Sequence, residues 1–312
     1  MTVEEWLLDS DPAIRWQVMR DLTDEPAEVV AAERARIARE GWGARLLSLQ
    51  GEDGQWGGGT YMPLYTSTSF TLMLLREMGL DPDSDEARRA VALVRRNSRW
   101  DHAGQPFFEG EVEPCINGMA VAIGAYFGED VGGIVERLAG EQMADGGWNC
   151  EQENGSTRGS FHSTIAVLEG LLEHERATGG TTAVTDARLR GQEYLLERGM
   201  LRRLSTGEVI EEDWTRFAYP TYYEYDVLRG LDYLRSAGIG PDARVAEAIE
   251  LVERKRDDDG RWARDKIHEG EVHFDMDDGV GKPSRWITLR ALRVLRWAEA
   301  SRRPSIASGA RS

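Results

Sequence analysis

Two cysteines, one histidine and one glutamate carry the clearest chemical signal in the sequence. Glu113 and Cys115 stand at the start of one apolar segment, His162 opens the next apolar segment, and Cys150 lies in the loop between them. Thiolate, imidazole and carboxylate groups suit tetrahedral zinc, and three protein ligands leave one position open for a substrate. The pattern predicts a zinc site if the two segment starts meet. The alternative is a pair of buried, unreactive cysteines and a histidine that caps a helix.

Aromatic residues on or beside the apolar segments form a second group of candidates. Such rings can line a cavity for an apolar chain and can stabilise a cation by cation-π attraction. The predicted substrate-binding residues are Phe70, Phe161, Tyr222, Tyr223, Tyr225 and Trp286. Aromatic residues at helical spacing are also ordinary core residues, which is the alternative interpretation.

Composition restricts the class of protein that these residues can serve. The chain has 312 residues, 41% of them hydrophobic, and a formal net charge of -17. This acidity argues against nucleic acid or anionic membrane as a partner, because both require basic surface. Two cysteines cannot form a disulfide framework, and no segment reads as a signal peptide or a membrane span. We therefore expect a cytoplasmic protein.

A tryptophan motif recurs along the chain and divides it into repeats. Residues 50–56 and 142–148 share the form Q-x-x-D-G-x-W, Trp262 ends a shorter version, and Trp100 and Trp214 are weaker candidates. The spacing of roughly 45 to 65 residues fits two helices and a loop.

Amphipathic segments alternate with more uniformly apolar ones between these motifs. A helix that is polar on one side lies outside, and a helix that is apolar almost all round is enclosed. Six apolar segments are predicted inner helices, at residues 14–22, 67–75, 115–127, 161–172, 222–234 and 285–297. With five to six outer helices they predict one all-α domain over residues 1–300, followed by a disordered tail at 301–312.

The two complete motifs resemble the QW motifs of squalene and oxidosqualene cyclases, and the helix-pair period is similar to that of protein prenyltransferase β subunits. The resemblance covers about residues 42–297. It implies a single α/α toroid in which every loop from an outer to an inner helix reaches the same mouth. It also implies that Gln50, Trp56, Gln142 and Trp148 stabilise the fold.

Site residues follow from the same resemblance. Protein prenyltransferases hold zinc with an acid two residues before a cysteine and with a histidine that opens the next inner helix, which places these roles on Glu113, Cys115 and His162, with Cys150 as a further candidate. The basic residues that grip a diphosphate before that cysteine are missing here.

The acidic run at Asp275, Asp277 and Asp278 resembles the D-x-D-D motif of class II terpene cyclases. In that motif the middle acid, kept protonated by its neighbours and by burial, protonates an alkene or epoxide. The resemblance gives this role to Asp277. Here a glycine-rich segment separates the motif from the next helix, and an exposed acidic loop is the alternative.

The leading prediction is a zinc-dependent enzyme, similar to prenyltransferases and terpene cyclases, that acts on an isoprenoid-like or other apolar small molecule. One alternative is a class II cyclase that uses Asp277, and another is a toroid that binds a lipid or a protein without catalysis. A partner subunit that completes the active site is a further alternative.

Overall fold

A computed structural model describes residues 1–302 of the chain. Over these residues the protein is helical and has no β-strand, only isolated bridges between loop residues. The all-α prediction is therefore confirmed. Within the same residues no helix combines the length and the apolar character needed to cross a membrane.

Each of the six apolar segments contains a helix. These helices are α2 (Pro12–Asp21), α5 (Thr68–Met78), α7 (Pro114–Tyr126), α9 (Phe161–Thr178), α11 (Val227–Ser236) and α13 (Arg285–Arg302). One boundary was wrong: residues 222–226 were predicted as helical, but they form a loop and α11 begins at Val227. Asp226 stops the helix from extending backwards, because its carboxylate accepts a 2.7 Å bond from the backbone N–H of Arg229 as an N-cap.

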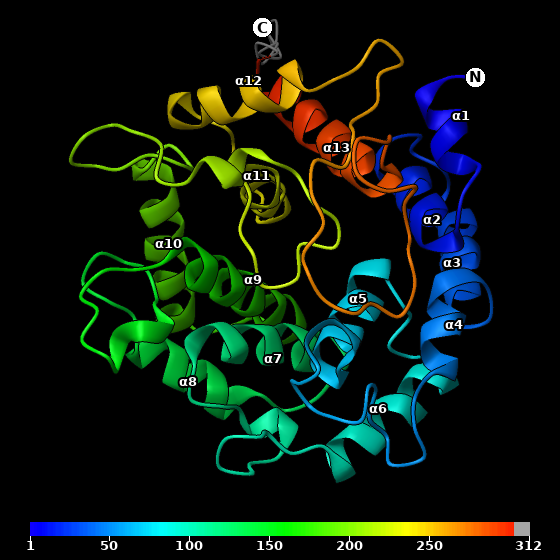
Figure 1. Ribbon diagram of the computed structural model, residues 1–312, viewed down its shortest axis with the longest axis vertical. Helices are drawn as coiled ribbons and strands as arrows, with labels where there is room; N and C mark the ends of the chain where they lie inside the picture. Colours follow the sequence, from blue (N-terminus) through cyan, green and yellow to red (C-terminus); the bar gives the residue numbers. More distant parts are fainter. Residues whose placement is uncertain (303–312) are drawn as a thin grey trace, which may run out of the picture.

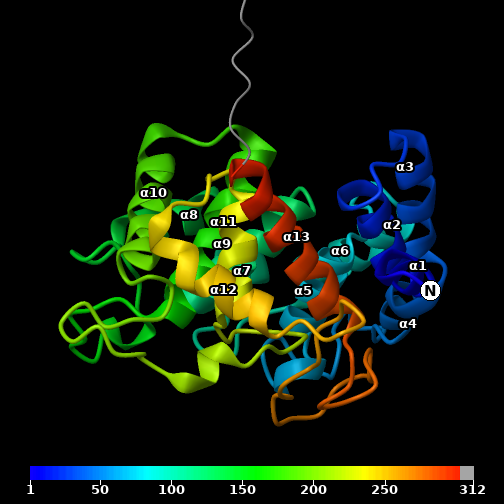
Figure 2. The ribbon, with the colours of Figure 1, turned by 90° about the horizontal axis from the view of Figure 1, so that it is seen from above.

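Over residues 1–302, seven further α-helices lie between or before these six. They are α1 (Val3–Leu8), α3 (Ala27–Ala35), α4 (Gly41–Ser48), α6 (Asp85–Asn97), α8 (Gly132–Gly140), α10 (Thr182–Glu197) and α12 (Ala246–Arg254). Figure 1 shows α6, α8, α10 and α12 towards the periphery and α5, α7, α9, α11 and α13 nearer the centre. Seen from above, α8 and α10 lie on one side of the molecule and α1 to α4 on the opposite side (Figure 2).

Three tryptophans each join one outer helix to the inner helix that follows it, by the same two hydrogen bonds. The indole N–H donates to a carbonyl ten residues earlier at 2.7 Å, and the backbone N–H donates to a threonine hydroxyl near the start of the next inner helix at 3.0–3.1 Å. The three sets are Leu46, Trp56 and Thr68; Leu138, Trp148 and Thr164; and Val252, Trp262 and Thr288. All three indoles are completely buried, so each bond is shielded from water.

The glutamines of the two complete motifs join neighbouring repeats. The Gln142 amide donates at 2.7 Å to Gly146 O in its own loop and at 2.7 Å to Ala187 O in α10. Gly146 has a φ of +86°, a conformation that a side chain would strain, which explains the glycine of the motif. Trp100 departs from the pattern, because its indole donates to Phe107 O within its own loop.

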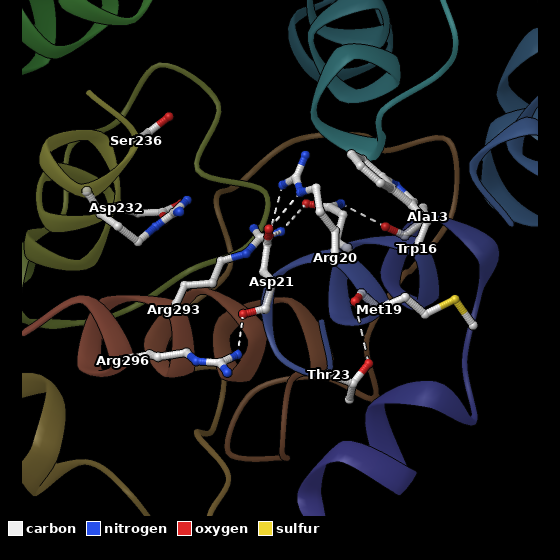
Figure 3. Close-up of polar contacts among 12 residues, drawn as sticks. Ala13, Trp16, Met19, Arg20, Asp21, Thr23, Asp232, Ser236, Arg293 and Arg296 are labelled. Atoms are coloured by element: carbon white, nitrogen blue, oxygen red, sulfur yellow. Dashed lines mark hydrogen bonds and ion pairs between the residues drawn. The ribbon is translucent and has the colours of Figure 1, made fainter. Parts of the chain in front are cut away.

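The first and last of the six apolar helices are in contact. On α13, Arg293 donates to the Gln17 side-chain oxygen at 2.7 Å and pairs with Asp21, both on α2. Arg296 donates to the Asp21 carbonyl at 2.6 Å and pairs with Asp24 at 2.8 Å. Figure 3 shows Arg293 and Arg296 of α13 reaching Asp21 of α2. Segments at opposite ends of the chain are thus joined by polar contacts, of which those of Arg293 are buried and those of Arg296 are exposed.

The predicted domain boundary lies close to the end of α13, which runs to Arg302 instead of residue 300. The rest of the predicted tail, residues 303–312, lies outside the described residues.

Replacement of Gln142 tests the motif. Gln142→Ala removes two hydrogen bonds to partly buried carbonyls, and we expect it to lower the free energy of unfolding by about 2 kcal/mol. Gln55→Ala changes a loop amide that makes neither bond and should cost less than about 0.5 kcal/mol. Urea denaturation of both variants measures the difference, and equal stability would show that the motif does not join the repeats.

Candidate metal centre

A loop held by side-chain hydrogen bonds places Glu113 and Cys115 at the start of α7. The Asn117 side chain holds this loop from both sides, accepting from Glu111 N at 2.7 Å and donating to Glu111 O at 2.7 Å. Arg137 on α8 donates to the same Glu111 carbonyl at 2.7 Å. Glu113 then precedes a proline in the first turn of α7, where a proline needs no N–H partner. The backbone that carries the two candidate ligands is therefore fixed.

Cys150 approaches the same place from the loop before α9. It begins a 3-10 helix, η4 (Cys150–Gln152), which is capped by the Asn149 side chain. Its backbone N–H donates to the Ser163 hydroxyl at 3.3 Å, and its sulfur lies 3.3 Å from that hydroxyl. Because Ser163 is in the first turn of α9, the loop cysteine is attached to that helix.

Glycines let α7 and α9 approach each other closely enough for the cysteines to meet. A Cβ atom at Gly118 would lie 2.6 Å from the Ala166 backbone, and one at Gly170 would lie 2.4 Å from Gly118 O. Both distances are shorter than any tolerated contact, so only glycine fits. The sulfur atoms of Cys115 and Cys150, which start from different helix pairs, are consequently 2.6 Å apart.

Glu113 completes a group of three ligands. Its carboxylate accepts from the Cys115 thiol at 3.5 Å, and one oxygen of Glu113 and both sulfurs all lie within 4.8 Å of one another. Both cysteines are free thiols. Among residues 1–302 no other set of three such side chains is this compact. Three of the four predicted metal ligands are therefore brought together.

The pKa values of the two thiols are shifted in opposite directions. The hydrogen bond between the two sulfurs lowers the pKa of Cys150, and the Ser163 hydroxyl contributes to this lowering. The same hydrogen bond and burial raise the pKa of Cys115. The pair thus favours a thiolate on Cys150 beside a thiol on Cys115, and a cation that binds both must release the Cys115 proton.

His162 lies beside this group but not in it. Its Nδ1 accepts a 2.9 Å hydrogen bond from the backbone N–H of Tyr225, so the imidazole proton is on Nε2. Burial lowers the pKa of His162, which keeps the ring neutral. A ring whose free nitrogen carries hydrogen donates a bond and does not ligate a metal. His162 still lines the cavity onto which Cys115 and Cys150 open.

This cavity has a volume of about 550 Å³ and mixed walls. Tyr61, Trp214 and Tyr223 supply aromatic surface, and Glu224 supplies a carboxylate. Sequence reasoning missed Tyr61, Trp214 and Glu224 as site residues. The available signal was Glu224, a charged residue inside the aromatic run 222–225. A helix enclosed by apolar neighbours would not have a charged residue at that position.

Glu224 is held by two cationic or polar partners. His268 Nδ1 lies 2.9 Å from one carboxylate oxygen, and Lys266 Nζ lies 3.1 Å from the other. The His268 hydrogen bond and Lys266 lower the pKa of Glu224 to about 2, so this carboxylate is ionised in any ordinary buffer.

The predicted substrate-binding aromatics are only partly at the cavity. Tyr223 is 39% exposed and lines it, while Tyr222 stacks on Tyr65 at a ring distance of 4.0 Å and reaches the narrow space behind Cys115. The other four are buried and do not line it: Phe70, Phe161, Tyr225 and Trp286.

The acidic run lies at the start of α13. The carboxylate of Asp277 accepts from the Ser284 hydroxyl at 2.6 Å and from Arg285 N at 3.3 Å, whereas Asp275 and Asp278 are exposed. Burial raises the pKa of Asp277 to about 6. Asp277, the middle acid, thus differs from Asp275 and Asp278 in its burial, as the D-x-D-D resemblance implies. It also accepts hydrogen bonds at the N-terminus of α13.

Comparison with known proteins adds no family assignment, since no family model and no curated protein matches the chain. The function therefore has to be argued from the site itself.

The titration of Asp277 is directly measurable. A raised pKa means that the protonated form favours the folded state and that this contribution is lost as pH rises through about 6. Between about pH 4.5 and pH 8 we expect the wild type to lose about 2 kcal/mol of stability relative to Asp277→Asn, from the shift of about 2 pKa units. Urea denaturation at both pH values measures this. A difference that does not change with pH would contradict a buried, elevated carboxyl.

Proposed function

We propose that the protein is a zinc-dependent enzyme with an α/α-toroid fold, similar to prenyltransferases and terpene cyclases, that acts on an apolar small molecule. The observation that carries the proposal is the convergence of Glu113, Cys115 and Cys150 on one point at the edge of a partly aromatic cavity. Glu113 and Cys115 come from the start of α7, and Cys150 comes from the loop before α9.

The helix arrangement supports the toroid. Outer and inner helices alternate along the chain, tryptophans join them in the same way three times, and α13 contacts α2. A series of helix pairs whose last member meets its first is what a closed toroid requires.

The donor set fits zinc. Two thiolates and a carboxylate are common zinc ligands, and a set of three leaves a fourth position for a substrate atom. In a tetrahedral site with bonds of about 2.3 Å the sulfurs lie about 3.8 Å apart. The cysteine pair, at 2.6 Å, has to open when it binds the ion. When bound, zinc would act as a Lewis acid on a substrate oxygen or would activate a nucleophile.

The residues around the cluster have complementary tasks. Tyr61, Trp214 and Tyr223 present apolar faces to the cavity, where they would pack against a hydrocarbon chain and exclude water. His162 presents an Nε2–H and would donate a hydrogen bond to a polar group of the substrate. Its orientation is fixed by the bond that Nδ1 accepts from Tyr225.

Metal analysis tests the proposal. Purified protein should hold one zinc per chain after dialysis, and Cys115→Ala and Cys150→Ala should each weaken zinc binding at least tenfold, since either change removes one of three ligands. His162→Gln is the matched control in the same cavity and should retain the metal, because His162 lies outside the cluster. A protein without stoichiometric zinc, or with zinc that both cysteine variants retain, would remove the proposal.

A protonation-initiated cyclase is the second candidate, favoured by the pKa of about 6 at the buried Asp277. Incubation with squalene or geranylgeranyl diphosphate, followed by product analysis, tests it. The candidate predicts a cyclic product that Asp277→Asn abolishes and that Asp275→Asn, at an exposed position, leaves largely intact. No cyclic product from either polyprene would count against it.

A further inference from the structure

A second cavity of about 360 Å³ lies among the apolar helices, bordered mainly by residues from their middle and C-terminal turns. Its lining is mostly charged: seven arginines and four carboxylates border it, an excess of three positive charges. The chain as a whole carries a net charge of -17. Arg20 and Arg176 are exposed, and the other five arginines are half-buried or buried. Buried positive charge costs desolvation energy and requires an explanation.

Two of the four carboxylates that line this cavity, Glu169 and Glu173, are hydrogen-bonded to arginines that also line it. Glu169 accepts two hydrogen bonds from Arg229, at 2.9 and 2.8 Å, in a side-by-side pair. Glu173 pairs with Arg76 at 3.0 Å. These pairs satisfy Arg76 and Arg229 but leave the other arginines without an equal number of anions.

Two arginines are hydrogen-bonded to neutral oxygen atoms. Arg34 donates to Gly79 O at 2.8 Å and to the Tyr126 hydroxyl at 3.0 Å. Arg176 donates to the backbone and side-chain oxygens of Ser236 at 2.5 and 2.8 Å. Burial lowers the pKa of Arg176, while the nearby Glu173 carboxylate raises it. A guanidinium with a free edge beside a cavity is suited to a planar or tetrahedral oxyanion.

Two further arginines that line the cavity, Arg290 and Arg293, have side chains that are largely shielded from solvent. Arg293 exposes only 7% of its side chain and has a buried Nε atom without a hydrogen-bond partner. Burial lowers its pKa to about 10 even though Asp21 is adjacent. Arg290 has only distant carboxylate partners, Glu77 at 3.7 Å and Asp232 at 3.9 Å. Figure 3 shows Arg293 of α13 among side chains of α2 and α11.

We propose that this cavity is a binding site for a compact phosphate-type polyanion, such as diphosphate or the phosphate group of a small metabolite. The excess of three positive charges matches a divalent or trivalent anion better than a monocarboxylate. Guanidinium groups from several helices offer the paired N–H donors that phosphate oxygens accept.

The site is separate from the metal centre. A narrow apolar space with room for about 20 Å³ lies between them and includes Cys115 and Met119 on one side and Arg76, Glu169 and Arg229 on the other. The anion site therefore does not rest on the proposed function. An anion there would contact α2, α5, α9, α11 and α13 together, and it would stabilise the contact between the ends of the chain.

Calorimetric titration with diphosphate at constant ionic strength tests the proposal, with inorganic phosphate and acetate as comparisons. We expect saturable binding of one diphosphate per chain, weaker binding of phosphate, no saturable binding of acetate, and a higher melting temperature with diphosphate. Arg34→Gln and Arg176→Gln should each weaken diphosphate binding at least tenfold. The matched control, Arg88→Gln, changes a 60% exposed arginine on α6 and should bind normally.

Two outcomes would overturn the site. One is the absence of saturable diphosphate binding to the unaltered protein. The other is binding that both cavity variants retain within twofold while circular dichroism shows them folded. Cys115→Ala should bind diphosphate with unchanged affinity, so that failure of the metal proposal and failure of this one are distinguishable.

Discussion

The hydrogen bond from a buried tryptophan indole to a carbonyl of the preceding outer helix is the constraint on which the rest of the structure depends. At Trp148 it fixes the loop that carries Cys150, because the Trp148 carbonyl also accepts from Ser160 N at 2.8 Å and closes that loop at its base. The backbone N–H of Trp148 holds Thr164 in the first turn of α9. One motif thereby positions both the cysteine loop and the inner helix against which it lies.

The interior has two chemically different ends. At the N-terminal turns of α7 and α9 it presents sulfur, carboxylates and aromatic rings around about 550 Å³. Towards the C-terminal turns it presents arginines around about 360 Å³. The apolar middle of the inner helices separates them, so each set of groups keeps its own charge and solvation. This division explains how an acidic chain can offer one site suited to a cation and another suited to an anion.

Much of this organisation could be predicted from sequence, because helical periodicity and the tryptophan motif are local signals. Glu113, Cys115 and Cys150 were grouped correctly, because the loop that carries Cys150 is attached to the start of α9, beside the start of α7. The position of His162 could not be predicted, since its Nδ1 is taken by Tyr225, 63 residues away along the chain. The loop at 222–226 was assigned to a helix because its aromatic residues mimic a core pattern. The arginine cavity was missed although Arg229, Arg290 and Arg293 interrupt otherwise apolar helices, a signal that went unused.

The central claim is that Cys115 and Cys150 bind one ion together, and X-ray absorption at the zinc edge of the zinc-loaded protein tests it most directly. The account predicts two sulfur neighbours at about 2.3 Å with lighter oxygen or nitrogen neighbours at about 2.0 to 2.2 Å. A spectrum with no sulfur neighbour, or one that Cys150→Ala leaves unchanged, would contradict it.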